Sequence, residues 1–219
     1  MPRKSIAAVT AVSLLVVPIG CSGSDDDDAA PDASIVQLGA PGGTNRELTD
    51  KEGAALEVPS FTQADVDFVH GMIAHHQQAL AMTALVSEQT EHDDIPLLAE
   101  RMDVSQRDEI ELMERWLDER DVQLPEGDDH AAHIGPMPGM LTPEELDALN
   151  DAAGPEFDRL FLESMIRHHQ GAVVMIETLL TGGEGGQESE IFQMAQHMEA
   201  DQQVEISRML ALLAELGGD

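Results

Sequence analysis

The sequence has little of several residue types on which common structures depend. Cys21 is its only cysteine, which excludes an internal disulfide. It has no tyrosine, one tryptophan and five phenylalanines, and no stretch alternates in the way that predicts strands. Only 11 Lys and Arg accompany 43 Asp and Glu, which gives a formal net charge of −32. Because nucleic-acid binding requires cations that neutralise phosphates, this charge excludes a nucleic-acid partner.

The N-terminus lacks an apolar run long enough to cross a bilayer comfortably. A basic start is followed by the short apolar run 6–17 and then by "PIGC", residues 18–21. This order predicts a secretory signal peptide over residues 1–20. The segment resembles a bacterial lipoprotein signal, in which the cysteine becomes an acylated N-terminus, although Pro18 stands where that family usually has an aliphatic residue. The resemblance implies an exported protein, anchored to the membrane through a lipid on Cys21 and facing the periplasm or the cell exterior.

The segment 21–47 is also short of large apolar residues. It is rich in Ser, Gly, Pro and Asp and includes a run of four aspartates. Such a composition cannot bury enough apolar surface to fold. We therefore expect a disordered acidic tether that holds the folded part away from the membrane.

Two stretches of the chain are nearly alike. "MIAHHQQALAM", residues 72–82, returns as "MIRHHQGAVVM", residues 165–175, after a shift of 93 positions. The same shift aligns residues 48–56 with residues 141–149, and both of these segments contain the Thr-x-x-Glu signature of a helix start. The sequence therefore predicts an internal duplication.

Each copy continues into two long segments of helical apolar periodicity, separated by the turns "TEHDD" and "TGGEGG". Two helical hairpins predict an all-α fold, an antiparallel four-helix bundle. We expect the bundle to span 48–217, with repeat one at 48–120, a proline-containing connector at 121–141 and repeat two at 142–217. The expected helices cover residues 62–88, 95–119, 156–180 and 187–216.

The predicted core stripe of every helix carries a polar residue between methionines. Residues three and four apart share one face of a helix, and this spacing selects His75, Glu109, His168 and Glu205. Because a buried polar group without a partner costs about 2–7 kcal/mol, we expect His75 and His168 to donate to Glu109 and Glu205. The second histidine of each pair should point about 100° away, toward a helix flank or a groove.

Three interpretations of this layer remain open. It could be a purely architectural polar layer that fixes helix register. It could be a di-iron site, but that chemistry requires Glu-x-x-His on two helices, and Met72 and Met165 stand where those glutamates belong. It could also be a site for Cu(I) or Ag(I), since neutral thioether and imidazole ligands suit such soft ions. Met72 precedes His75 by one turn, as Met165 precedes His168, so each pair could reach one ion.

The connector supports the third interpretation. Its stretch "HAAHIGPMPGM" holds His130, His133, Met137 and Met140 within eleven residues. A charged, proline-containing loop needs no methionine for packing. These four side chains could therefore close over one ion.

The repeated motifs resemble a known family. "FVHGMIAHHQQALAM" and "FLESMIRHHQGAVVM", each followed by a Gln-x-x-Glu helix and separated by "MPGMLTPEEL", resemble the bacterial domain of unknown function family 305 over residues 48–216. The resemblance implies a ferritin-like four-helix bundle, export, and for some members an association with periplasmic copper and silver handling. It implicates Met72, His75, His76, Met82, Met165, His168, His169, Met175, Met137 and Met140.

We therefore expect an extracytoplasmic lipoprotein that binds a soft cation, Cu(I) or Ag(I), in metal binding or resistance. No nucleophile with a base and an orienting group is evident, so we expect no enzymatic activity. The alternatives are a non-metal envelope interaction module with an architectural His/Glu layer, and a di-iron oxidase. The predicted metal-site residues are Met72, His75, His76, Met82, Met165, His168, His169, Met175, Glu109, Glu205, His130, His133, Met137 and Met140.

Overall fold

The computed structural model describes residues 36–37, 44–49, 51, 59–124 and 137–217. The chain divides into two compact units, Met1–Leu56 and Glu57–Asp219. The predicted signal peptide, Cys21, His130 and His133 lie outside the described residues, as does most of the predicted tether. None of the described helices is both long enough and apolar enough to span a membrane.

The N-terminal unit contains one short ladder that the sequence did not predict. Strand β1, Val36–Gln37, pairs antiparallel with β2, Arg46–Glu47. Val36 lies opposite Glu47, and Gln37 lies opposite Arg46. Each strand has only two residues, so the alternating pattern that predicts longer strands is absent here.

The second unit contains the four long helices that the periodicity predicts, and every helix end lies within two residues of its expected position. The first hairpin consists of α2, Gln63–Gln89, and α3, Ile95–Asp118. The second consists of α6, Gly154–Thr181, and α7, Ser189–Leu216. A short helix, α5, Pro143–Asp151, precedes the second hairpin. The fold is thus an all-α bundle of two hairpins.

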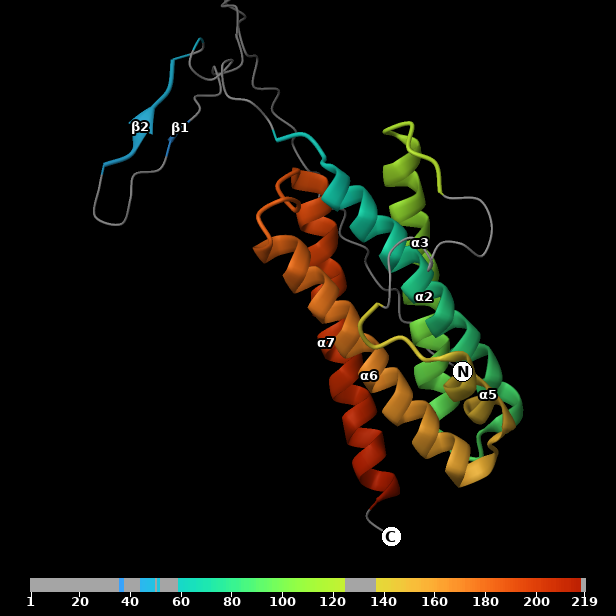
Figure 1. Cartoon of the computed structure of the whole chain (residues 1–219). Coiled ribbons are helices and arrows are strands. Elements are labelled where there is room, and N and C mark those ends of the chain that lie inside the picture. The colour runs from blue at the N-terminus through green and yellow to red at the C-terminus, as the bar shows by residue number, and fades with distance from the viewer. Residues whose placement is uncertain (1–35, 38–43, 50, 52–58, 125–136, 218–219) are drawn as a thin grey trace, which may run out of the picture. The chain divides into compact units, whose positions relative to one another are not determined.

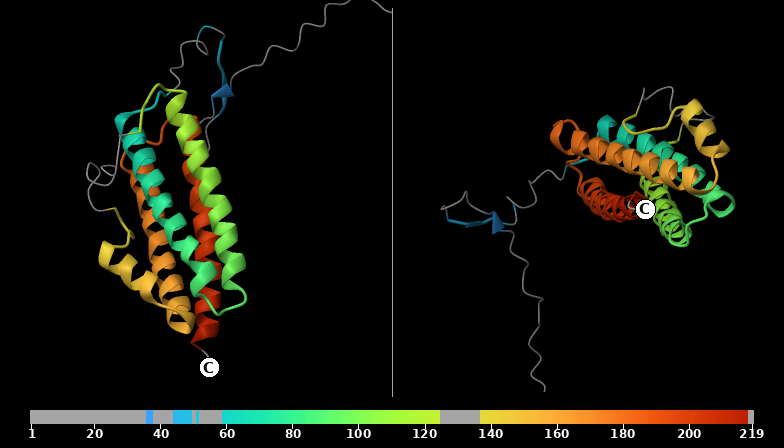
Figure 2. Two further views of the ribbon diagram at one scale, coloured as in Figure 1. Left: turned by 90° about the vertical axis from the view of Figure 1, so that its right-hand side faces the viewer. Right: turned by 90° about the horizontal axis from the view of Figure 1, so that it is seen from below.

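The two hairpins meet mainly through their first helices. Helix α3 packs against α2, α7 packs against α6, and α2 packs against α6. Viewed along the bundle, α2 and α6 lie on one side and α3 and α7 on the other (Figures 1 and 2). Helix α5 contacts both α2 and α6. The helices that carry the double histidines therefore face each other.

Capping boxes begin two of the helices. Thr142 accepts a hydrogen bond from the backbone N–H of Glu145, whose carboxylate accepts one from Thr142 in return, as the Thr-x-x-Glu signature predicts. Thr62 and Asp65 make the same arrangement at the start of α2. Asp65 is fully buried, and its second oxygen accepts from the backbone N–H of Gly186 at 2.6 Å. This carboxylate therefore joins the start of α2 to the turn between α6 and α7.

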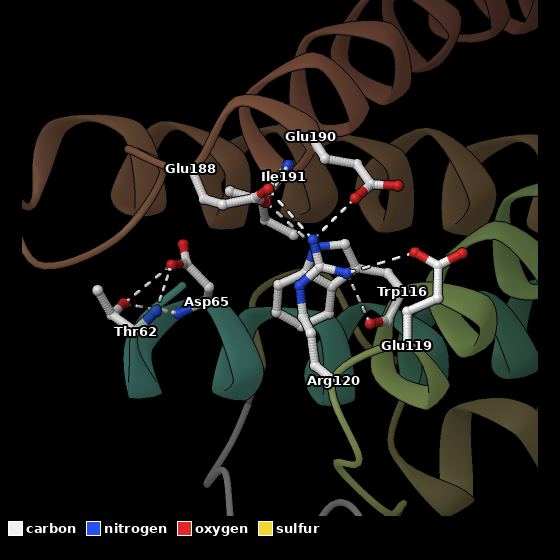
Figure 3. A network of polar contacts seen from close by, with 8 residues as sticks. All are labelled: Thr62, Asp65, Trp116, Glu119, Arg120, Glu188, Glu190 and Ile191. Atoms are coloured by element: carbon white, nitrogen blue, oxygen red, sulfur yellow. Dashed lines mark hydrogen bonds and ion pairs between the residues drawn. The ribbon is translucent and has the colours of Figure 1, made fainter. Parts of the chain in front are cut away.

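Arg120 connects the hairpins at the same end of the bundle (Figure 3). Its guanidinium donates to Glu188 at 3.1 Å and to Glu190 at 2.8 Å, and lies 4.4 Å from the centre of the Trp116 ring. Although burial opposes ionisation of Glu188, hydrogen bonds from the Ile191 N–H and Trp116 together with the charge of Arg120 lower the pKa of that carboxyl. Glu188 also caps α7, so one carboxylate serves both a helix start and a contact between hairpins.

The apolar core consists of two clusters with the histidine layer between them. One contains Met82, Met102, Met165 and Met209, and the other contains Met72, Met113, Met194 and Met198. All of these methionines are at most 3% exposed. Met175, which the shift of 93 places at the position of the buried Met82, is only partly buried. Aliphatic and thioether packing thus takes the place that aromatic side chains occupy in many cores.

Candidate metal centre

The double histidines of both repeats meet in one layer at the centre of the bundle. Helix α2 supplies His75 and His76, and α6 supplies His168 and His169. All four side chains are at most 1% exposed. The predicted convergence of the two repeats at one depth is therefore present in the structure.

The rings of His75 and His168 lie against each other at a tilt, and this contact is here called the stacked pair. Their ring centroids are 3.8 Å apart, and the ring planes meet at 41°. Burial lowers the pKa of His75 to about 3, and the adjacent His76 adds to the effect. Burial, followed by the neighbouring His75, also holds the pKa of His168 well below its ordinary value. Both rings are consequently neutral at physiological pH, which is the state in which imidazole binds a metal.

The glutamates of the layer bind the other two histidines, so the predicted pairing was wrong by one residue. His76 Nε2 lies 2.7 Å from Glu109 Oε2, and His169 Nε2 lies 2.6 Å from Glu205 Oε2. His76 and His169 are also buried, which contradicts the prediction that they point to a flank or groove. The physical reason is that α2 faces both α6 and α3, so two adjacent positions, about 100° apart, can each be directed at a neighbouring helix.

Three imidazole nitrogens of the layer have no hydrogen-bond partner among the described residues. They are Nδ1 of His76, Nδ1 of His169 and Nε2 of His168. An ionised carboxylate only accepts hydrogen bonds, so Nε2 of a neutral His76 or His169 carries the proton and Nδ1 carries the lone pair. A carboxylate that holds a histidine in this way is the usual companion of a histidine that ligates a metal.

The predicted methionine ligands lie in the core clusters, at a surface pocket, or, for Met140, in neither of these places. Met72 and Met165 are fully buried and, because α2 and α6 are antiparallel, they belong to the core clusters on opposite sides of the histidine layer. Met82 is also fully buried, in the same cluster as Met165. Met137 and Met175 instead line an open pocket of about 400 Å³ between the start of α2 and the end of α6. Met140 is partly buried.

The pocket and the histidine layer are adjacent but separate. None of the four histidines lines the pocket. Pro138 contacts both, because it lines the pocket and its carbonyl oxygen lies 3.0 Å from His75 Nε2. Sequence reasoning missed Pro138, since the interacting group is a backbone carbonyl, which every residue type possesses.

The described residues do not form a metal site of the carboxylate-rich kind. Within the described ranges, no three His, Cys, Asp or Glu side chains are grouped so that they could hold a metal ion. The di-iron alternative requires such a group. In the described part of the chain, the imidazoles of the histidine layer do not form such a group by themselves.

The fold and the layer together define a class, an all-α bundle of two similar hairpins with histidines and methionines at its centre. A family model for the domain of unknown function DUF305 matches residues 65–213. The chain belongs to this family, as its repeated motifs indicate. Comparison with curated proteins gives no match.

Solved structures of the family have the same fold. A DUF305 protein from Streptomyces coelicolor, described as a predicted secreted protein, is 31% identical and matches over 70% of this chain and 94% of its own, with a TM-score of 0.62. A DUF305 fragment from Deinococcus radiodurans is also 31% identical, over 72% of this chain and 99% of its own, with a TM-score of 0.62. CopM in its Cu(I)-bound form is 29% identical, over 70% of this chain and 98% of its own, with a TM-score of 0.56. CopM has also been solved with Cu(II) and with silver bound.

Proposed function

We propose that this protein binds a soft monovalent cation, Cu(I) or Ag(I), through imidazole and thioether ligands, and acts in metal binding or resistance. The observation that carries the proposal is the buried layer in which His75 and His168 stack while three imidazole nitrogens lack a hydrogen-bond partner within the described ranges. Burying polar atoms without partners is costly, and a bound ion would satisfy them.

The chemistry of the layer favours a soft ion over a hard one. Neutral imidazole and thioether groups match Cu(I) and Ag(I), whereas hard cations prefer several oxygen ligands. Glu109 and Glu205 are each engaged by a histidine, so we assign them the role of orienting His76 and His169. The copper and silver complexes of CopM are consistent with this choice of ions.

The same proposal includes the place of the protein in the cell. The lipoprotein-like "PIGC" segment supports export and attachment to the membrane through Cys21. The Streptomyces coelicolor relative, described as a predicted secreted protein, agrees with export. We propose that binding of the ion, rather than catalysis, is the activity.

Anaerobic titration with Cu(I), or with Ag(I) as a redox-stable substitute, tests the function. We expect saturation at a low stoichiometry and a higher unfolding temperature, since a ligand at 100 times its Kd stabilises the native state by about 2.7 kcal/mol. The double variant His75→Leu/His168→Leu should lose this binding. The control His92→Ala removes a histidine from the turn between α2 and α3 and should bind as the wild type does.

A second pair of substitutions covers the case in which the double histidine variant fails to fold. Met72→Leu/Met165→Leu nearly conserves side-chain volume, which usually costs less than about 1.5 kcal/mol, and should weaken binding while leaving the fold intact. If the wild-type protein shows neither saturable uptake nor stabilisation, the layer is architectural and the interaction-module alternative holds. Uptake of iron with consumption of oxygen would instead support the di-iron alternative.

A further inference from the structure

The segment Met137–Leu141, here called the strap, is held closely against the bundle. A Cβ atom on Gly171 of α6 would lie 2.0 Å from the Pro138 carbonyl oxygen, and one on Gly139 would lie 2.5 Å from the Arg167 carbonyl oxygen. Gly139 also has a φ of 78°, a conformation that favours glycine. The strap can therefore approach α6 only because both positions lack a side chain.

Gln78 of α2 fixes the other end of the strap. Its side-chain amide donates to the Leu141 carbonyl oxygen at 3.0 Å, and its side-chain oxygen accepts from the Leu141 N–H at 2.8 Å. Positions 78 and 171 are equivalent in the two repeats, because they differ by the shift of 93. One repeat thus supplies hydrogen bonds to the strap, while the other supplies the space that it occupies.

The strap also makes a polar contact with the histidine layer. His75 Nε2 donates to the Pro138 carbonyl oxygen, which places the proton on Nε2 and leaves the lone pair on Nδ1. The Glu109 carboxylate likewise accepts from Nε2 of His76, and the Glu205 carboxylate accepts from Nε2 of His169. Three of the four histidines are therefore held with their protons on the same ring nitrogen, and for one of them the acceptor belongs to the strap.

We propose that docking of the strap selects the Nδ1-ligating tautomer of His75 and thereby prepares the histidine layer for a soft cation. The proposal rests on the function proposed above and adds a positioning role for the Pro138 carbonyl. Backbone acceptors and carboxylates that orient metal-binding histidines typically account for 10–100-fold in metal affinity. His168 has no such acceptor at Nε2 among the described residues, so the strap makes the two repeats unequal.

Two variants detach the strap without altering a histidine or a methionine. Gly171→Ala adds a methyl group where the Pro138 oxygen lies, and alanine suits the helix interior at least as well as glycine. Gln78→Ala removes both hydrogen bonds to Leu141. The matched control is Gln89→Ala, which removes a similar bond from a glutamine of α2 to the Asn150 carbonyl, away from the strap.

The tautomers can be read directly by 15N NMR of the histidine side chains in the metal-free, full-length protein. We expect His75, His76 and His169 to carry their protons on Nε2 in the wild type and in Gln89→Ala. In Gly171→Ala and Gln78→Ala, His75 should become a mixture of tautomers while His76 and His169 stay unchanged. Ag(I) affinity should then fall about tenfold in the two strap variants only.

The outcomes separate this inference from the proposed function. If His75 carries its proton on Nδ1 in the wild type, or if it keeps the wild-type tautomer in both strap variants, the positioning role is wrong even when Ag(I) binds. Unchanged or tighter Ag(I) binding in the strap variants would also overturn it, because the strap would then be neutral or obstructive. Failure of the wild type to bind Ag(I) would refute the proposed function, while the tautomer measurement would still show whether the strap positions His75.

Discussion

Adjacent histidines on one helix make different contacts in this protein. His75 stacks on His168, whereas His76 donates to Glu109 on another helix. Within the described part of the chain, no ion pair joins a carboxylate to His75 or His168, and burial is the largest cause of the lowered pKa of both rings. A buried ring of this kind stays neutral until the solution is strongly acidic.

Acid should therefore destabilise the metal-free protein through the stacked pair. The pKa of His75 is about 3 in the folded protein and about 6.5 in the unfolded chain, so between these values the unfolded state binds more protons. Above pH 6.5 both histidines are neutral in the folded and in the unfolded state, and their burial costs no ionisation energy. As the pH falls below 6.5, only the unfolded chain takes up these protons, so the free energy of unfolding decreases. Each of the two histidines should lower the free energy of unfolding by about 1.4 kcal/mol per pH unit in this window.

Urea unfolding at several pH values between 7.5 and 4.5 measures this slope. The double variant His75→Leu/His168→Leu should show a shallower slope, by up to two protons, while carboxylates elsewhere contribute equally to both proteins. Equal slopes for the two proteins would show that the stacked pair is protonated at the same pH in the folded and unfolded states.

The helical hairpins are joined by side-chain contacts at both ends of the bundle. At one end Arg120, just after α3, binds Glu188 and Glu190 at the start of α7 (Figure 3). At the other, the Thr90 hydroxyl donates to the buried carboxylate of Asp158. These contacts fix how far one hairpin can slide along the other, and so they maintain the alignment of the histidine layer.

Removing Arg120 should destabilise the bundle more than removing an exposed arginine. Arg120 is 14% exposed and Glu188 is 15% exposed, so Arg120→Ala leaves a largely buried carboxylate without its cation. We expect a loss of about 1–3 kcal/mol in the free energy of unfolding. Arg159→Ala breaks only an exposed pair with Glu163 and should cost less than about 0.5 kcal/mol. Thermal and urea unfolding of both variants provide the comparison, and equal losses would contradict the role given to Arg120.

Helix bounds were predictable because apolar spacing and turn residues are local signals. The periodicity placed α2 at 62–88, and the structure has Gln63–Gln89. The partners of individual histidines were less predictable. A stripe of apolar residues is about as wide as the angle between two adjacent positions, so the spacing cannot decide whether His75 or His76 faces Glu109.

The contacts of the strap were beyond the sequence for a different reason. The stretch "MPGM" suggested methionine ligands, but the group that reaches His75 is the Pro138 carbonyl. Gln78 and Gly171 carry no signal of their own until the chain is folded, because they act on residues more than 30 positions away. Met137 and Met175 were named as candidates, and the structure adds that they share a pocket distinct from the histidines.

The molecule as a whole carries far more negative than positive charge. With 43 acidic and 11 basic side chains, the formal net charge is −32. Most of the described carboxylates lie on exposed helix faces, where they repel one another through water. This surface attracts cations of any kind without selecting among them, so under the proposed function any selectivity between ions must come from the buried histidine layer.

Screening of this charge should stabilise the fold. The Debye length falls from about 30 Å at 0.01 M salt to about 3 Å at 1 M, so repulsion between surface carboxylates weakens. We expect the unfolding temperature of the metal-free protein to rise steadily between 10 mM and 1 M NaCl, and to rise equally in KCl. A flat or falling temperature would show that repulsion contributes little, and a difference between the two salts would indicate specific ion binding.

The contact between His75 and His168 makes the proposed ion site depend on both hairpins at once. Each hairpin carries only one ring of the pair, so neither half of the duplicated chain forms the proposed ion site by itself. An ion bound there would contact both hairpins and would therefore stabilise their association. Separation of the two hairpins would divide the ligands between them and would release the bound ion.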